Sequence, residues 1–282
     1  YKFLKNKSNK IDAFWKEISE SLITNSVFTS DVFKHFIEWI IAFNCCKIRV
    51  IRKSSAFFVF SLFECLANSI SWRKSEIKKY QQKSTCKSKA QTNDQISLFQ
   101  NEITLYTSVA IELYKKLIIV RVRDIDEVIR ILSIKSLTNA IIINDAEFFE
   151  EQKLKYIGRA LNDTSANNRL EAIKCFEKII VHATESLDEN NFSYTQKNKK
   201  SNEKVDEKVD EQDDNQEKIK NVLIDFSEMY SPRIIEMCND SDEEVVAEAI
   251  KCIGVLIDSQ LINPNDCQNI KNLISDNSQI IR

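Results

Sequence analysis

Apolar residues recur at intervals of three and four along most of the chain, which is the spacing of an amphipathic helix. The clearest case lies in residues 148–180, where Leu154, Ile157 and Leu161 form one stripe and a second stripe follows. Between the stripes, residues 162–165 read Asn-Asp-Thr-Ser, side chains that accept hydrogen bonds from the free N–H groups of a helix start. So short a connection predicts an antiparallel helical hairpin. Each of its helices buries one side only, so the hairpin needs neighbours.

The same spacing predicts helices along the rest of the chain. Only two Gly and two Pro occur in 282 residues, which is too few for the tight turns of a strand-rich fold. Residues 56–60, Ala-Phe-Phe-Val-Phe, are ambiguous between strand and helix, but the length of the surrounding pattern favours helix. The further predicted helices are 11–24, 31–43, 47–70, 95–122, 124–142, 220–239 with a kink or a new start at Pro232, 243–257 after a capping box at 241–244, and one beginning at Asn263-Pro264.

Three of these helices resemble one another. Their sequences are DEVIRILSIKSL, SANNRLEAIKCF and DEEVVAEAIKCI, with a small residue at the same place, namely Ser133, Ala172 and Ala249. The first two small residues are 39 positions apart and the last two are 77 apart. Removing an insertion of about 35 residues from the second interval leaves about 42, the period of HEAT and armadillo repeats. Chance similarity among amphipathic helices is the alternative interpretation. We expect an all-α, HEAT-type helical-repeat solenoid, curved and hook-like.

The insertion is predicted over 185–219, where EKVDEKVDE is a local tandem repeat and no aromatic residue follows Tyr194. Such a segment buries too little apolar surface to offset its ordering entropy, so we expect disorder there. This divides the chain into helical repeats over 1–184, the insertion, and further repeats over 220–282. The last residues, NSQIIR, stop within a helical pattern, so we expect a fragment of a longer chain.

Several kinds of chemistry have no support in the sequence. Eight Cys form no C-x-x-C pair and the two His lie far apart, so we expect no metal site. Two Gly leave no glycine-rich phosphate loop, and no nucleophile has a base and an orienting acid at a recognisable spacing. No apolar run reaches the roughly 20 residues of a membrane span. We therefore predict no catalytic residue, no cofactor, no small-molecule substrate and no membrane insertion, with reduced Cys65, Cys175 and Cys252 in the core.

The net charge of −2 conceals a strongly basic segment. Residues 71–92 hold seven Lys or Arg against a single Glu, which favours salt-dependent contact with a nucleic-acid backbone; the alternative is a solvated loop. A second basic group begins the helix at residue 47, where hydrogen bonds to nearby carbonyls or Asp are the favoured interpretation of Arg49 and Arg52. The candidate DNA-binding residues are Lys47, Arg49, Arg52, Lys53, Arg73, Lys74, Lys78, Lys79 and Lys83.

Five segments in register resemble the SA (stromalin) subunit of cohesin. LKYIGRALND followed by RLEAIKCFEKI is similar to the LKYIGW-x-LHD and VRLKC-x-x-AL elements of the stromalin-conservative domain, here within 116–182. VRVRDIDEVIRILSIKSLTNAI resembles HRYRD-x-x-x-EIR, and KIRVIRKSSAF resembles VR-x-FRHT-x-T. MYSPRIIEMCNDSDEEVVAEAIK and NPNDCQNI resemble the elements that follow. The resemblance implies a non-enzymatic HEAT-repeat scaffold in the nucleus, associated with chromosomes. Its implied partners are the kleisin subunit, double-stranded DNA and cohesin regulators.

The resemblance also implies a surface that binds regulators. Where the family has a Trp and an Arg that clamp aromatic-containing peptides, this chain has Arg159 and Met229, so we expect that ligand class to be lost. Arg121, Arg123 and Asp124 form a charged corner that is either a ligand-facing edge or a rung of an ion-pair ladder between repeats. The candidate partner-binding residues are Arg121, Arg123, Asp124, Lys155, Tyr156, Arg159, Phe226, Met229 and Tyr230. A nuclear-transport or trafficking adaptor without a DNA role is the alternative function.

Overall fold

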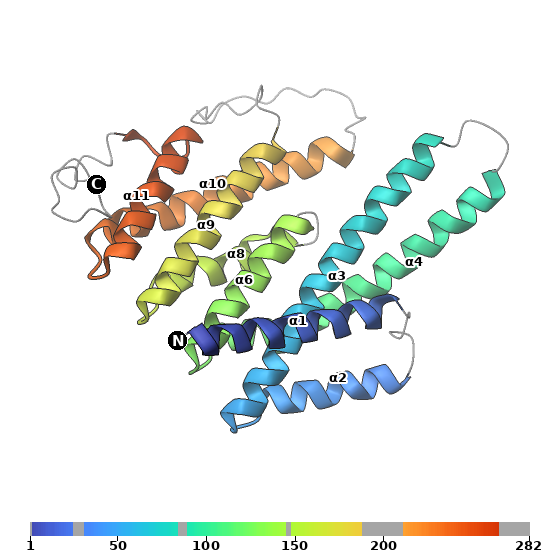
Figure 1. Ribbon diagram of the computed structural model, residues 1–282. Helices are drawn as coiled ribbons and strands as arrows, with labels where there is room; N and C mark the ends of the chain where they lie inside the picture. The colour runs from blue at the N-terminus through green and yellow to red at the C-terminus, as the bar shows by residue number, and fades with distance from the viewer. Residues whose placement is uncertain (1, 25–30, 84–88, 145–147, 188–210, 265–282) are drawn as a thin grey trace, which may run out of the picture. The chain divides into compact units, whose positions relative to one another are not determined.

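The computed structural model describes residues 2–24, 31–83, 89–144, 148–187 and 211–264 (Figure 1). Every regular element within these ranges is a helix, which confirms the predicted all-α class. The chain divides into two units, residues 1–145 and 146–282, which are described separately below. None of the described helices combines the length and the apolar character that a membrane span requires.

The first unit is built around one long helix, α3 (Arg49–Lys83). Helices α1 (Lys2–Thr24), α2 (Asp31–Asn44), α4 (Lys89–Leu113) and α6 (Glu127–Ile143) all pack against it (Figure 1). Because α3 has neighbours on several sides, its Ala-Phe-Phe-Val-Phe segment is largely buried and helical, which resolves the strand ambiguity. A π-helical turn, η2 (Tyr114–Ile118), and the short α5 (Ile119–Arg121) connect α4 to the turn before α6.

The basic segment between α3 and α4 is more helical than its composition predicts. We expected a helix end or loop in its second half, yet α3 continues to Lys83 and α4 begins at Lys89 rather than near residue 95. Aromatic rings provide the reason, because Phe99 of α4 lies between Trp72 and Tyr80 of α3 at centroid distances of 5.8 and 6.1 Å. These contacts hold the polar half of α3 against α4.

The second unit contains the predicted hairpin, formed by α8 (Glu151–Ala160) and α9 (Ala166–Ser186). Helix α10 (Glu211–Glu236) packs on both, a 3₁₀ turn η3 (Met237–Asn239) follows, and α11 (Glu243–Asp258) lies against α9. Pro232 lies inside α10 and does not start a new helix. The N-cap of α11 is Asp242, so the capping box predicted with Ser241 at its head is wrong by one residue.

The boundaries of the predicted insertion need correction at both ends. Helix α9 extends to Ser186 and α10 begins at Glu211, so part of the segment 185–219 is helical. Ile219 is buried, so apolar packing stabilises α10 ahead of the predicted start at residue 220. Residues 188–210 and the helix predicted after Asn263-Pro264 lie outside the described residues.

The three small residues that aligned the repeat are all fully buried. Ser133, Ala172 and Ala249 each have no exposed surface, as expected where helices approach closely. Ser133 adds a hydrogen bond from its hydroxyl to the carbonyl of Ile118 at 2.9 Å. Cys65, Cys175 and Cys252 are buried thiols, as predicted.

Candidate partner and nucleic-acid interfaces

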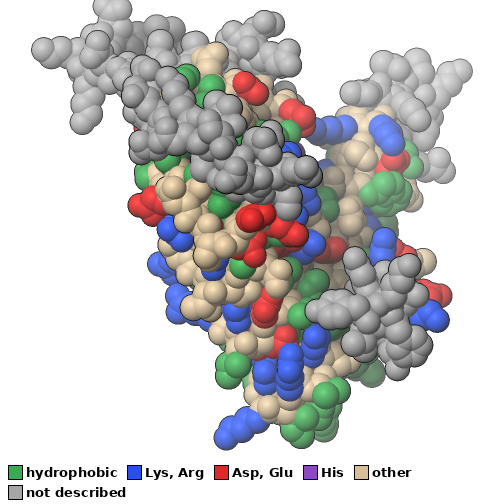
Figure 2. All heavy atoms as spheres, turned by 60° about the vertical axis from the view of Figure 1, so that its left-hand side comes forward, with side chains coloured by type: hydrophobic (Ala, Val, Ile, Leu, Met, Phe, Trp, Pro, Cys, Tyr) green, Lys and Arg blue, Asp and Glu red, His purple; other side chains and the backbone are tan. Residues whose placement is uncertain are grey.

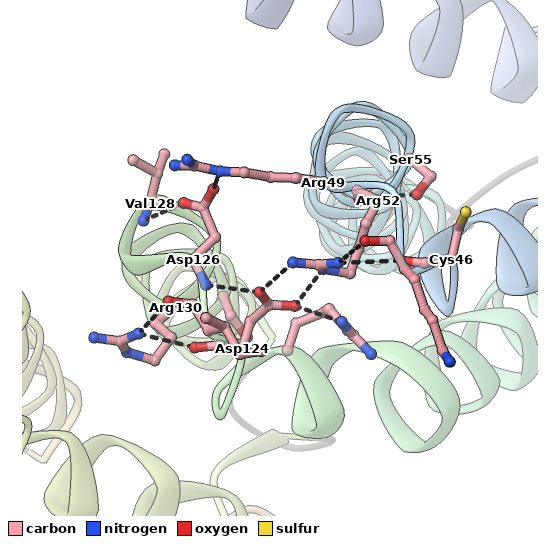
Figure 3. Close-up of polar contacts among 12 residues, drawn as sticks. Cys46, Arg49, Arg52, Ser55, Asp124, Asp126, Val128 and Arg130 are labelled. Carbon is pink, nitrogen blue, oxygen red and sulfur yellow. Dashed lines mark hydrogen bonds and ion pairs between the residues drawn. The ribbon is translucent and has the colours of Figure 1, made fainter.

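The turn before α3 and the turn before α6 are joined by an arginine. Arg52 donates from Nε and Nη2 to the two carboxylate oxygens of Asp124, at 3.0 and 3.3 Å, across 72 residues of sequence (Figure 3). Its Nη1 donates to the carbonyls of Cys46 and Lys47 at 3.1 and 3.3 Å, closing its own turn. One guanidinium therefore joins the turn before α3 to the turn before α6.

The carboxylate of Asp124 is almost completely enclosed. Its side chain is 2% exposed, it also pairs with Arg121, and it accepts from the backbone N–H of Asp126 at 2.8 Å. Arg130 donates from Nη1 to the carbonyls of Asp124 and Ile125 at 2.8 and 3.2 Å (Figure 3). The corner thus has the geometry of a ladder rung. Arg52, Arg121 and Asp124 are thus engaged inside the protein, which agrees with the structural interpretation of Arg52 and with the ion-pair ladder, and disfavours their direct contact with DNA or a partner.

Arg49 contributes a second ion pair between the same two turns. Its Nε lies 2.6 Å from Oδ2 of Asp126, the N-cap of α6, whose side chain also accepts from the N–H of Val128 (Figure 3). Burial alone would raise the pKa of Asp126, but the Arg49 hydrogen bond, nearby Lys53 and the Val128 N–H together lower it. The Arg49 side chain remains 72% exposed, so this residue still presents charge to solvent.

The second unit repeats the arrangement. Arg169 donates to both oxygens of Asp240, at 2.8 and 2.6 Å, and its Nη1 donates to the carbonyls of Asp163 and Thr164 at 3.0 and 3.2 Å. The two side chains are 12% and 7% exposed. Their hydrogen bonds raise the pKa of Arg169 and lower that of Asp240. This is the same use of one guanidinium as at Arg52.

The basic segment of α3 separates into structural and exposed residues. Arg73 is buried, donating to Glu102 at 2.6 Å and to the Tyr106 hydroxyl at 3.2 Å, so its predicted role in DNA contact is corrected. Lys74 donates to the side chain of Asn144 at 2.9 Å. Two residues are exposed: Lys78, and Lys79, which pairs with Glu76 at 2.6 Å. The side chain of Lys83 lies outside the described residues, whereas Lys47 is exposed and Lys53 half-buried.

The second unit gathers its predicted partner-binding residues where α8 meets α10. Tyr230 of α10 lies directly over Gly158 of α8, and an added Cβ at that glycine would come within 2.3–2.4 Å of the ring. Burial raises the pKa of Tyr230, and the charge of nearby Arg159 opposes that shift. Arg159 and Met229 are exposed, and both are therefore accessible to a partner.

The remaining predicted residues divide in the same way. Phe226 is buried between Phe176 and Tyr230, with ring centroids 4.7 and 5.3 Å away, so it supports the surface from beneath and does not reach a partner. Lys155 and Tyr156 are half-buried, with the Lys155 ammonium 5.7 Å from the Tyr156 ring centre. Arg123 of the first unit is exposed. On the face drawn in Figure 2, Lys and Arg side chains lie among Asp and Glu side chains.

Comparison with known proteins agrees with the order of these elements. The model of the STAG domain matches residues 2–102, that of the stromalin conservative domain matches 123–197, and that of the HEAT repeat matches 231–260. The chain is of the stromalin type. In this stromalin-type chain the conservative domain covers the turn of Asp124, α6, α8 and α9, including Tyr156 and Arg159.

One curated relative and one solved structure are similar to the chain. Sister-chromatid cohesion protein 3 of Arabidopsis thaliana is 26% identical over 290 residues, covering 100% of this chain and 23% of the relative. The solved structure of the cohesin subunit Scc3 from Z. rouxii, residues 88–1035, matches with a TM-score of 0.72 at 17% identity, covering 95% of this chain and 28% of that one. The stromalin-type chain thus spans about a quarter of the length of these relatives and has the helical-repeat fold.

Sequence reasoning missed part of the turn network. Asp126, Arg169 and Asp240 were not predicted, and Asp163 was predicted only as a helix cap, because the repeat was aligned on its helices and not on its turns. The sequence does contain a pattern that marks these turns, because Asp124 stands six residues before Arg130 and Asp163 stands six residues before Arg169. Among the described residues no group of three or more His, Cys, Asp or Glu side chains is arranged to hold a metal ion.

Proposed function

We propose that this chain is part of a non-enzymatic scaffold subunit of cohesin that acts in sister-chromatid cohesion, in the nucleus and on chromosomes. The observation that carries the proposal is the succession of a STAG domain and a stromalin conservative domain on one helical-repeat framework. Of the two relatives, one is named a sister-chromatid cohesion protein and the other a cohesin subunit. The buried chemistry of the turns joins helices and leaves the exposed surfaces for partners. No observation favours the transport adaptor.

The proposed partners are a kleisin subunit, the DNA backbone and cohesin regulators. Co-purification of the full-length protein from its own cells tests the complex: recovery of the kleisin and the two other core subunits in stoichiometric amounts is expected. Recovery of transport factors in their place, with no core subunit, would reject the proposal. Because the chain covers only part of its relatives, the experiment requires the full-length protein.

For DNA, the proposed contact is the pair Lys78 and Lys79 on the polar half of α3. Both are exposed and both belong to the basic segment, and Lys–phosphate contacts give affinity that falls with salt. The double change Lys78→Glu/Lys79→Glu is expected to weaken binding of a fluorescent duplex at least tenfold at low salt and to reduce the salt slope. Anisotropy titrations at several salt concentrations measure both.

A matched control is available on η2. Lys115 and Lys116 are also adjacent and exposed, and Lys116 pairs with Glu112 at 2.6 Å as Lys79 does with Glu76. Lys115→Glu/Lys116→Glu makes the same change in net charge. Equal loss of affinity in the two double variants would mean that net charge alone matters, and the proposed contact would be wrong.

For protein partners, the proposed surface is the exposed rim of α8 and α10 that carries Arg159 and Met229. The exposed guanidinium of Arg159 suits a partner with acidic and aromatic side chains. Arg159→Glu is expected to weaken capture of a regulator by the whole protein, whereas Lys178→Glu, at an exposed residue of α9, is not. Equal capture by Arg159→Glu and the unaltered protein would remove this surface from the proposal.

A further inference from the structure

Helix α2 has two parallel rows of side chains. One row is buried in the first unit, and the other is exposed, although its Phe36 also meets Phe58 of α3 at a ring-centroid distance of 5.4 Å. Phe33, Ile37, Ile40 and Asn44 are buried, in line with the packing of α2 on α3. Each buried residue of this row is preceded in the sequence by an exposed apolar residue. These exposed residues are Val32, Phe36, Trp39 and Phe43. Their spacing of four, three and four is that of a heptad seam, the pattern by which one helix packs against another.

The exposed stripe is large for a surface feature. Trp39 is 63% exposed, Phe43 41% and Phe36 37%. At about 150–250 Å² for an aromatic side chain, the three rings alone expose on the order of 300 Å², the size at which apolar patches on monomers are often functional. The rings of Trp39 and Phe43 lie 5.8 Å apart, so they present one continuous aromatic surface.

Positive charge lies at the carboxyl end of this stripe. The turn after α2 closes on Phe43, whose carbonyl accepts from the N–H of Cys46 at 3.1 Å, and Arg52 fixes the carbonyls of Cys46 and Lys47. Lys47 and Arg49 therefore follow immediately beyond the last aromatic ring, and both are exposed. Arg49 is paired with Asp126 at 2.6 Å, which offsets much of its charge, so Lys47 is the main exposed cation at this end.

We propose that the exposed stripe of α2 is a docking site for an acidic amphipathic helix of a partner chain. The heptad spacing selects a helix with its own apolar seam, and the exposed cation of Lys47 selects acidic residues at the end that lies beside it. This site is separate from α8 and α10 and from Lys78 and Lys79, and it does not depend on the proposed DNA or regulator contacts.

Two synthetic peptides test the site with the whole chain. Both carry Leu at the four seam positions; one has Glu at the flanking positions and its twin has Lys. By fluorescence anisotropy the Glu peptide is expected to bind saturably and at least tenfold more tightly than its twin. Trp39→Ala/Phe43→Ala is expected to weaken that binding at least tenfold, and Lys47→Glu severalfold, with a smaller dependence on salt.

The control is Leu98→Ala/Val120→Ala, which removes two exposed apolar side chains from other helices of the same unit. It should leave peptide affinity unchanged, and circular dichroism should show that every variant is folded. Equal affinity for the two peptides, or binding that survives Trp39→Ala/Phe43→Ala, overturns the proposal. The proposal is also overturned if sedimentation equilibrium shows a dimer that Trp39→Ala/Phe43→Ala dissociates, because a second copy would then be the occupant. Binding of duplex DNA through Lys47, without binding of the Glu peptide, would overturn it as well.

Discussion

The buried pair of Arg169 and Asp240 is expected to hold α9 and α11 together. Arg169→Met removes two hydrogen bonds to the carboxylate and two to the carbonyls of Asp163 and Thr164, while keeping most of the side-chain volume. Removing one partner of a buried pair costs about 3–5 kcal/mol. Asp240 keeps a hydrogen bond from the N–H of Asp242 at 3.1 Å, so the lower end, about 3 kcal/mol, is expected.

Urea unfolding followed by circular dichroism measures this loss, and hydrogen exchange of the α11 amides shows whether it occurs in the second unit. Lys251→Met is the control, because Lys251 also joins α11 to α9 through Glu177, at 3.1 Å, but is 62% exposed. An exposed pair is worth less than about 1 kcal/mol. A loss for Arg169→Met no larger than that of Lys251→Met would refute the argument that burial gives the rung its strength.

The same pair sets a pH dependence. The hydrogen bonds from Arg169 are the main cause that holds the pKa of Asp240 below its ordinary 3.8. A lowered pKa adds stability that is complete above about pH 4 and is lost as the pH falls through the folded value. In Arg169→Met the pKa of Asp240 rises towards its ordinary range, so this variant should lose less stability than the unaltered protein between about pH 5 and pH 2. Parallel acid-unfolding curves would contradict the assignment.

Three further predictions concern packing and burial. Arg52→Met should cost about 2–3 kcal/mol of unfolding free energy, because Asp124 keeps Arg121; a double-mutant cycle with Asp124→Asn should show coupling above about 1 kcal/mol. Gly158→Ala should cost about 1–3 kcal/mol in thermal unfolding, and the same change should cost much less in a Tyr230→Ala background, since the ring fills the space of the new Cβ. Burial raises the pKa of the Cys252 thiol far above 9.0, so iodoacetamide at pH 8 should alkylate the exposed Cys45 at least tenfold faster in the folded protein.

Much of the fold could be predicted from the sequence, because apolar periodicity directly reports which helix faces are buried. The hairpin of α8 and α9 and the helices that pack on α3 follow from that pattern. The boundaries that failed, at Lys83, Lys89 and Glu211, lie in polar segments where helix is stabilised by a few distant contacts. The ring of Phe99 between Trp72 and Tyr80 is such a contact, and no local pattern announces it.

The candidate sites were harder to predict because charge alone does not show whether a side chain is occupied. Arg73 and Lys78 are both basic residues of the same segment of α3, yet Arg73 is buried against Glu102 and Lys78 is exposed. The difference depends on which face of α3 meets α4. The exposed stripe of α2 was missed for a related reason. A wide apolar arc on a helix predicts burial, and only the packing shows that half of the arc is left uncovered.

The turns also indicate where the ladder ends. In three turns an Arg donates to the backbone carbonyl of the residue six positions before it. Arg52 donates to Cys46, Arg130 to Asp124 and Arg169 to Asp163. The turn at Asp240 accepts from Arg169, but the residue six positions on is Val246, which is buried. An apolar side chain there cannot cap the carbonyls of its own turn or donate to a following carboxylate. The turn of Asp240 therefore receives a rung and does not supply one, so α11 can join a later helix only by apolar contact at this position.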